Sequence, residues 1–161
     1  MFEYLEASAE KLREIWEYNI AVNAGDDRWI RWGNAARSDN ASGRTKTFLV
    51  LRDGEPVGEG TLIFDPSCSA ISGRRELADG RKIVNVNALR IRKEYENMGH
   101  ISALMKKMES YAREHGYTRI TIGAEAKEAR NLAIYLHWGY TQFLLHEIED
   151  GELVLYYGKN L

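Results

Sequence analysis

The chain is poor in several kinds of residue, and each shortage excludes a class of protein. Cys68 is the only cysteine among 161 residues, so no intramolecular disulfide can form and no cysteine cluster can bind a metal. No apolar run approaches the ~18 residues that a membrane-spanning helix needs. The 22 basic and 24 acidic residues leave a formal charge of −2. This balance gives no electrostatic case for binding nucleic acid or an anionic membrane.

What remains is ordinary globular composition, with 44% apolar and 29% charged residues. The length suits one domain with a hydrophobic core, so we expect a single domain over 1–161. The first residues, MFEYLEASAEKLREI, are acidic and amphipathic, unlike a secretion signal. These features predict a protein of the reducing cytoplasm.

Hydrophobic periodicity predicts a mixed α/β domain with the element order β-α-α-β-β-β-α-β-α-β-β. The expected helices cover 7–22, with Ser8 as its cap, 26–36, 98–115 and 128–137. The expected strands cover 1–5, 47–52, 56–64, 83–92, 118–122, 140–148 and 152–157. Asp53-Gly54 and Asp150-Gly151 predict hairpin turns. We expect loops at 38–44 and 65–81, the longer one either mobile or functional. The last strand, with the sequence LVLYYGK, is a candidate homodimer edge.

The stretch from Asn87 to Met105, NALRIRKEYENMGHISALM, joins a strand to an amphipathic helix through a polar turn. A strand that enters a helix over a glycine, here Gly99, leaves several backbone N–H groups without partners in one place. The positive end of the helix dipole lies at the same point. The sequence therefore predicts an anion site suited to phosphate.

The same stretch resembles the GCN5-related N-acetyltransferase (GNAT) family, whose fourth strand runs into its helix through a pattern like L-x-V-x-P-x-Y-R-G-x-G-x-G/A. The corresponding positions here are Leu89, Ile91, Lys93, Tyr95, Glu96, Asn97, Gly99 and Ile101. The chain departs from the family at Lys93, Glu96 and Ile101, where Pro, Arg or Gln, and Gly or Ala are usual. Further on, Tyr135–Tyr140 resembles the family's Y-x-x-x-G-F.

This resemblance implies a mostly antiparallel central sheet with helices on both faces and a V-shaped split between the fourth and fifth strands. It implies acetyl-CoA as co-substrate, no metal, and direct attack by an amine in a ternary complex. The residues expected to contact the coenzyme are Leu89, Arg90, Ile91, Glu96, Asn97, Met98, Gly99, His100, Ile101 and Asn131. Glu96 is expected to face solvent or to pair with a basic residue.

Tyr135 matches the family tyrosine that protonates the departing thiolate. The alternative is a core aromatic residue of a short helix. Asn131 lies four residues earlier on the same helix face, either for coenzyme contact or as a surface amide.

No general base is evident, because Asn85 and Asn87 stand where many relatives carry an acidic residue. Glu59, on the neighbouring strand, is the first substitute, unless it is only an exposed strand carboxylate.

The acceptor is equally open. Trp29 and Trp32, with Asp26 and Asp27, either form an aromatic, acidic wall for a cationic amine or serve as core residues and a helix cap. Basic residues near the long loop either meet an acidic substrate or are solvated; they are Arg74, Arg75, Arg81 and Lys82.

Two functions follow. The first is acetyl transfer from acetyl-CoA to an amine of a small molecule or protein. The second is a catalytically weak or inactive acyl-CoA-binding sensor or interaction module of the same fold.

Overall fold

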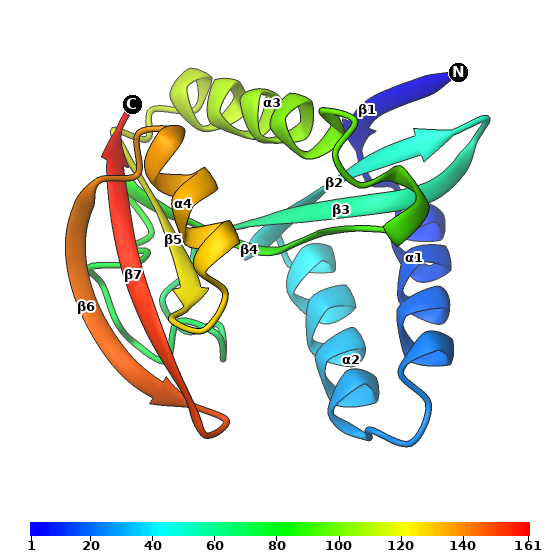
Figure 1. Ribbon diagram of the computed structural model, residues 1–161, viewed down its shortest axis with the longest axis horizontal. Helices are drawn as coiled ribbons and strands as arrows, with labels where there is room; N and C mark the ends of the chain where they lie inside the picture. Colours follow the sequence, from blue (N-terminus) through cyan, green and yellow to red (C-terminus); the bar gives the residue numbers. More distant parts are fainter. The chain divides into compact units, whose positions relative to one another are not determined.

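The computed structural model describes residues 1–161, and its helices and strands follow the predicted order (Figure 1). The strands are β1 (Phe2–Glu6), β2 (Thr45–Arg52), β3 (Glu55–Ile63), β4 (Ile83–Ile91), β5 (Arg119–Glu125), β6 (Gln142–Glu149) and β7 (Glu152–Asn160). The helices are α1 (Ala9–Val22), α2 (Arg28–Ala41), the 3-10 turn η1 (Lys93–Tyr95), α3 (His100–Glu114) and α4 (Ala129–His137). No helix is both long and apolar enough to cross a membrane.

The strands form one sheet in the order β1-β2-β3-β4-β5-β7-β6. β1 pairs antiparallel with β2, and β7 pairs antiparallel with both β5 and β6. β4 and β5 are parallel, and their register runs only from Ile83–Arg119 to Val86–Ile122, although both strands continue beyond it. The predicted sheet, mostly antiparallel and split between its fourth and fifth strands, is confirmed.

The contacts of the chain group into two compact units, which are residues 1–62 with 88–108, and residues 63–87 with 109–161. In the first unit α1 packs on β2 through a buried cluster. It comprises Leu12, Ile15, Trp16, Leu49 and Leu51. On the opposite face of the sheet, a Cβ added to Gly60 of β3 would lie 2.8 Å from the Sδ of Met108 on α3. Helices therefore cover both faces of this part of the sheet, as the resemblance implied.

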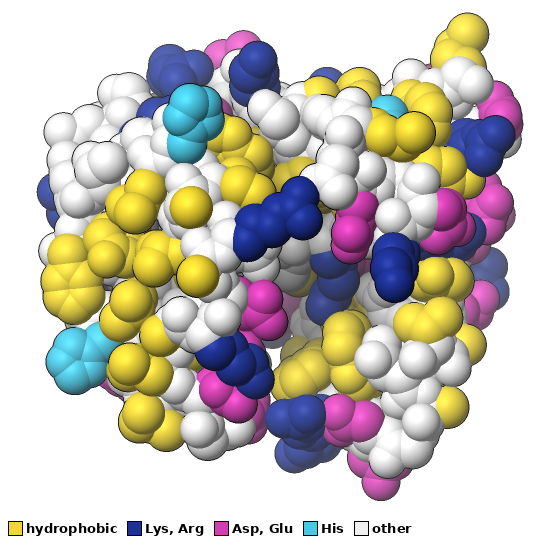
Figure 2. All heavy atoms as spheres, viewed as in Figure 1, with side chains coloured by type: hydrophobic (Ala, Val, Ile, Leu, Met, Phe, Trp, Pro, Cys, Tyr) yellow, Lys and Arg dark blue, Asp and Glu magenta, His cyan; other side chains and the backbone are white.

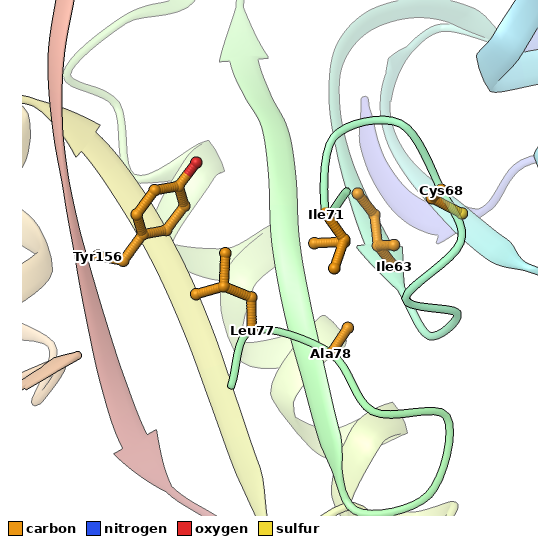
Figure 3. Close-up of a cluster of buried hydrophobic side chains, with 6 residues drawn as sticks. All are labelled: Ile63, Cys68, Ile71, Leu77, Ala78 and Tyr156. Atoms are coloured by element: carbon orange, nitrogen blue, oxygen red, sulfur yellow. The ribbon is translucent and has the colours of Figure 1, made fainter. Parts of the chain in front are cut away.

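The core of the second unit includes much of the segment between β3 and β4 (Figure 3). Its buried side chains are Ile63, Cys68, Ile71, Leu77, Ala78 and Tyr156. The sequence predicted that this long segment is mobile or functional. Its apolar residues supply core, and a run of turns, with the Gly73 N–H donating to the Pro66 carbonyl at 2.8 Å, folds the segment onto itself. A functional role for the segment stays a prediction.

Both predicted hairpin turns are confirmed. Asp53 and Gly54 have φ of 48° and 85°, and Asp150 and Gly151 have 49° and 80°, the left-handed pair that a two-residue turn of type I′ requires. The helix cap at Ser8 is also confirmed, since its hydroxyl accepts the Lys11 N–H at 3.2 Å.

Two predictions were wrong. The polar stretch at 38–44 was expected to be a loop, but α2 continues to Ala41. The Asp39–Arg44 ion pair (2.7 Å) and the Asn40 amide, which accepts the Thr47 N–H at 3.1 Å, hold this end of the helix in place. Tertiary contacts here override a weak helix propensity.

The candidate dimer edge was also misplaced. β7 lies between β5 and β6, so β6, not β7, forms this edge of the sheet. Hydrophobic side chains gather over β6 and β7 on the left of Figure 2, and Phe143 and Ile148 are 52% and 69% exposed.

Candidate functional site

The turn that follows β4 is built for an anion. After η1, Asn97 and Gly99 both take left-handed backbone angles, with φ of 61° and 84°. α3 then starts at His100, and the N–H groups of Met98, Gly99, His100 and Ile101 donate to no backbone carbonyl. Consecutive unpaired N–H groups at a helix start form a concave donor site that suits a diphosphate.

The space around this turn fits such a group. A Cβ built on Gly99 would meet no atom within 4 Å, so the backbone can be approached closely there. Glu96 and Met98 are exposed. The expectation that Glu96 faces solvent is met.

His100 plays a part that the sequence did not reveal. It is only 8% exposed, its Nδ1 lies 2.8 Å from the Tyr4 hydroxyl, and its ring packs against Phe2 with 4.0 Å between centroids. These contacts tie the first turn of α3 to β1. Of His100, only the backbone N–H is therefore placed to serve an anion.

The second half of β4 divides its side chains between the two faces of the sheet. Cβ atoms built on Gly58 and Gly60 would meet Ile91 and Leu89 at 3.1 and 2.9 Å, so both side chains lie on the α3 face. Ala88 adopts a left-handed φ of 55°, which is strained for alanine and marks an irregularity where the pairing with β5 has ended.

Arg90 points to the other face, where it meets Glu59. The Glu59 side chain is 2% exposed, and its Oε1 accepts from the Nε of Arg90 at 2.8 Å and forms an ion pair with the Nη2 at 2.6 Å. Its Oε2 accepts from the Asn19 amide at 3.2 Å. Glu59 is therefore a buried, ion-paired carboxylate, not the exposed strand residue of the alternative interpretation.

Aromatic rings of α1 and α2 surround this ion pair. The Arg90 guanidinium lies 5.1 Å from the Trp16 ring and 4.9 Å from the Trp29 ring. Trp29 in turn contacts Trp32 edge-on at 5.2 Å. Neither the Asn19 contact nor these cation–π contacts was signalled by the sequence, because they join residues far apart in the chain.

One of the two acidic residues of the predicted acceptor wall, Asp26, is already paired. Arg28 donates to both oxygens of Asp26, at 3.0 and 2.9 Å, and its guanidinium lies 5.2 Å from the Trp32 ring. The hydrogen bond from Arg28 lowers the pKa of Asp26. Asp27 precedes α2 but makes no side-chain cap hydrogen bond.

In the second unit, Tyr135 lies on α4 with its ring 5.9 Å from that of Trp138. Burial raises the pKa of its phenol, so the hydroxyl stays protonated at neutral pH. Asn131 is exposed one turn earlier on the same helix. A protonated phenol is the form that can act as an acid.

Asn85 and Asn87 differ in their surroundings. Asn85 is buried, and its amide donates to the Thr121 hydroxyl at 2.9 Å, which donates in turn to the Leu77 carbonyl at 2.8 Å. This network ties β4 to β5 and to the segment before β4. Asn87, two residues on, is exposed.

No group of three or more His, Cys, Asp or Glu side chains is arranged to hold a metal ion.

The strand, turn and helix around Gly99 form a candidate anion site within a mixed α/β fold, and comparison with family models identifies the family. Residues 7–140 match the model of the acetyltransferase (GNAT) family, so the chain belongs to that family. Comparison with curated protein sequences finds no relative.

Solved structures share the fold at low sequence identity. A PaiA N-acetyltransferase from Thermoplasma acidophilum in complex with coenzyme A is 14% identical, with a TM-score of 0.64 and coverage of 100% of this chain and 99% of the other. A ribosomal-protein-alanine N-acetyltransferase from Brucella melitensis is 17% identical, with a TM-score of 0.71 and 99% coverage of both chains. A spermidine N-acetyltransferase chimera from Vibrio cholerae and hSSAT is 13% identical, with a TM-score of 0.72 and coverage of 98% of this chain and 95% of the other.

Proposed function

We propose that this protein is an N-acetyltransferase that moves the acetyl group of acetyl-CoA to a primary amine by direct attack. The observation that carries the proposal is the run of unpaired N–H groups from Met98 to Ile101, which suits the coenzyme's diphosphate. The free backbone edge of β4 beyond Val86 suits the pantetheine amides, which pair as an added strand does. We propose that the reaction takes place in the cytoplasm.

In this proposal Tyr135 supplies a proton. The acceptor nitrogen forms the new C–N bond as the C–S bond of the thioester breaks, and the departing thiolate takes the phenol proton. The amine's surplus proton leaves to water, and Tyr135 regains its own from solvent. The phenol is protonated at neutral pH, as a proton donor must be before the step, and it can bind a proton again afterwards.

The buried carboxylate of Glu59, in the first unit, is not free to act as a general base. Glu59 is paired with Arg90 and Asn19. If Glu59 acted as a base, it would lose its ion pair with Arg90 when it took up a proton. We therefore propose that the acceptor reacts as a neutral amine, with Glu59 acting through Arg90.

The alternative is an acyl-CoA-binding sensor of little or no activity. The Glu59–Arg90 ion pair favours this alternative, because Glu59 is not free to act as a base. The family pattern also favours it, because Gly99 is the only glycine of that pattern that this chain keeps. The two functions share the coenzyme site and differ in turnover.

Isothermal titration with acetyl-CoA, followed by a thiol-release assay over an amine panel, tests the proposal. We expect binding, and a kcat for Tyr135→Phe that falls by about 10²-fold or more with little change in coenzyme affinity. Tyr157→Phe, a matched loss of a β7 hydroxyl, is the control and should keep full activity. Binding without turnover on any amine favours the sensor, and no binding at millimolar acetyl-CoA rejects both functions.

A further inference from the structure

The guanidinium of Arg90 is held along one edge and open along another. Its Nε donates to Oε1 of Glu59, and its Nη2 lies 2.6 Å from the same oxygen, so the ion pair occupies the side-on edge. The Nη1 group and the second N–H of Nη2 have no partner in the chain, and the side chain is 32% exposed. A guanidinium carries five N–H donors, and its end-on pair matches the two oxygens of a carboxylate.

The surroundings fix this open edge in place. Trp16 and Trp29 pack against the guanidinium, and Glu59, itself tied to Asn19, cannot turn away because it is buried. A cation held by a buried counter-ion and two indoles loses little side-chain entropy when it binds a ligand. Arg90 is thus preorganised for an anionic partner.

The same arrangement argues against a cationic acceptor. Trp29 and Trp32, whose rings could attract an ammonium group, each already have a guanidinium beside them: Arg90 lies over Trp29 and Arg28 over Trp32. Asp26, one of the two acidic residues of the predicted wall, is paired with Arg28. A polyamine would therefore meet cations where it needs carboxylates and free aromatic faces.

We propose that Arg90 binds a carboxylate of the acceptor, so that the acetylated amine belongs to an amino acid or another small amino-carboxylate. This inference rests on the proposed acetyl transfer and names its substrate class. Glu59 is a positioning residue, whose buried charge aims the end-on edge of Arg90 toward the ligand.

Turnover gives the first test. We compare amino acids with their own primary amides and with polyamines, all with acetyl-CoA at saturation. The carboxylate should raise kcat/KM over the amide by roughly 10–100-fold, as a charged hydrogen-bonded pair does. Arg90→Lys, which keeps the charge and loses the fork, should reduce that preference, and the double variant Arg90→Gln with Glu59→Gln should abolish it. Arg13→Gln, on the exposed face of α1, should leave it unchanged.

Binding gives a second test that needs no turnover. Because Trp16 and Trp29 flank Arg90, a ligand seated there should change the tryptophan fluorescence, which we measure with N-acetyl amino acids and their amides as probes. A fluorescence change with the acids only, lost in the double variant, supports the proposal. Equal binding of acids and amides overturns it, as does a preference for polyamines. A double variant that binds acetyl-CoA normally and keeps its carboxylate preference also overturns it.

Failure of the underlying acetyl transfer gives a different result. In that case acetyl-CoA does not bind or no amine is acetylated, whereas the fluorescence comparison of acids and amides still decides whether Arg90 recognises a carboxylate.

Discussion

Two carboxylates of this chain are stabilised by different kinds of donor. Glu59 accepts from the side chains of Arg90 and Asn19, whereas Asp79 accepts from the backbone. The Oδ1 of Asp79 takes the N–H groups of Arg81, Lys82 and Ile83 at 2.8, 2.8 and 2.9 Å, directly before β4. Such a residue fixes the start of a strand by satisfying donors that would otherwise be unpaired.

Asp79→Asn should therefore destabilise the protein in a pH-dependent way. Burial raises the pKa of Asp79, but the three backbone N–H groups and Arg81 lower it further, so the net pKa lies below its ordinary value. A lowered pKa stabilises the folded state at pH values above the unfolded-state pKa of about 4. This stabilisation is lost as the pH falls through the lower pKa of the folded state. Urea unfolding should show a loss of about 1–2 kcal/mol at pH 7, shrinking below about pH 4.

Asp27→Asn is the control for this prediction, because its side chain makes no cap hydrogen bond at α2. A loss of stability at Asp79 that stays the same size down to pH 2.5 would contradict the role of its charge.

Single residues also mark the limit of what the sequence predicts at the site. Strand alternation places Leu89 and Ile91 on one face and Arg90 on the other, as period two requires. The sequence could not indicate that Glu59 is the partner of Arg90, or that Trp16 and Trp29 cover it, because those contacts arise from tertiary packing. The roles of Tyr135, Asn131, Asn85 and Asn87 stay predictions.

Between elements, the pairing of β5 with β7 depends on a glycine opposite an aromatic ring. Gly123 is the register partner of Tyr156, and a Cβ added to it would lie 2.6 Å from the ring's Cε1. The ring cannot easily move aside, because the Arg74 guanidinium lies over it at 5.0 Å and Glu149 accepts a hydrogen bond from its hydroxyl. The glycine leaves room for the ring against the strand.

Gly123→Ala should lower the free energy of unfolding by roughly 1–3 kcal/mol through overpacking, measured by urea denaturation. Gly158→Ala in β7 is the matched control, since its added Cβ would meet its nearest atom, Cδ1 of Leu144, at an ordinary 3.5 Å. That change should be neutral or slightly stabilising. Equal losses for both variants would refute the steric argument.

Helices and hairpins were predicted from the sequence more reliably than the segments between them. The Asp-Gly turns and the Ser8 cap are local signals, and they held. The end of α2 depends on particular side-chain contacts of Asp39 and Asn40, and the packing of the long segment before β4 depends on distant residues, so composition alone was misleading there. The edge of the sheet was misassigned for the same reason, since strand order is a property of the whole sheet.

Over the whole molecule, coenzyme binding should appear as added stability. At a hundred times its Kd, a ligand that binds only the folded state adds about 2.7 kcal/mol. For a chain of this size that corresponds to a rise in Tm of roughly 5–10 °C with acetyl-CoA, measured by scanning calorimetry. ATP at the same concentration, which has phosphates but no pantetheine, should give a much smaller rise. Equal rises would indicate a general phosphate site.

The one cysteine has a practical consequence for such experiments. Cys68 is 4% exposed and lies in the segment that connects β3 to β4, whose apolar side chains are buried (Figure 3). A thiol reagent that counts released coenzyme A should therefore see little background from the folded protein. Without acetyl-CoA, the rate at which this single thiol is labelled reports how often the segment opens.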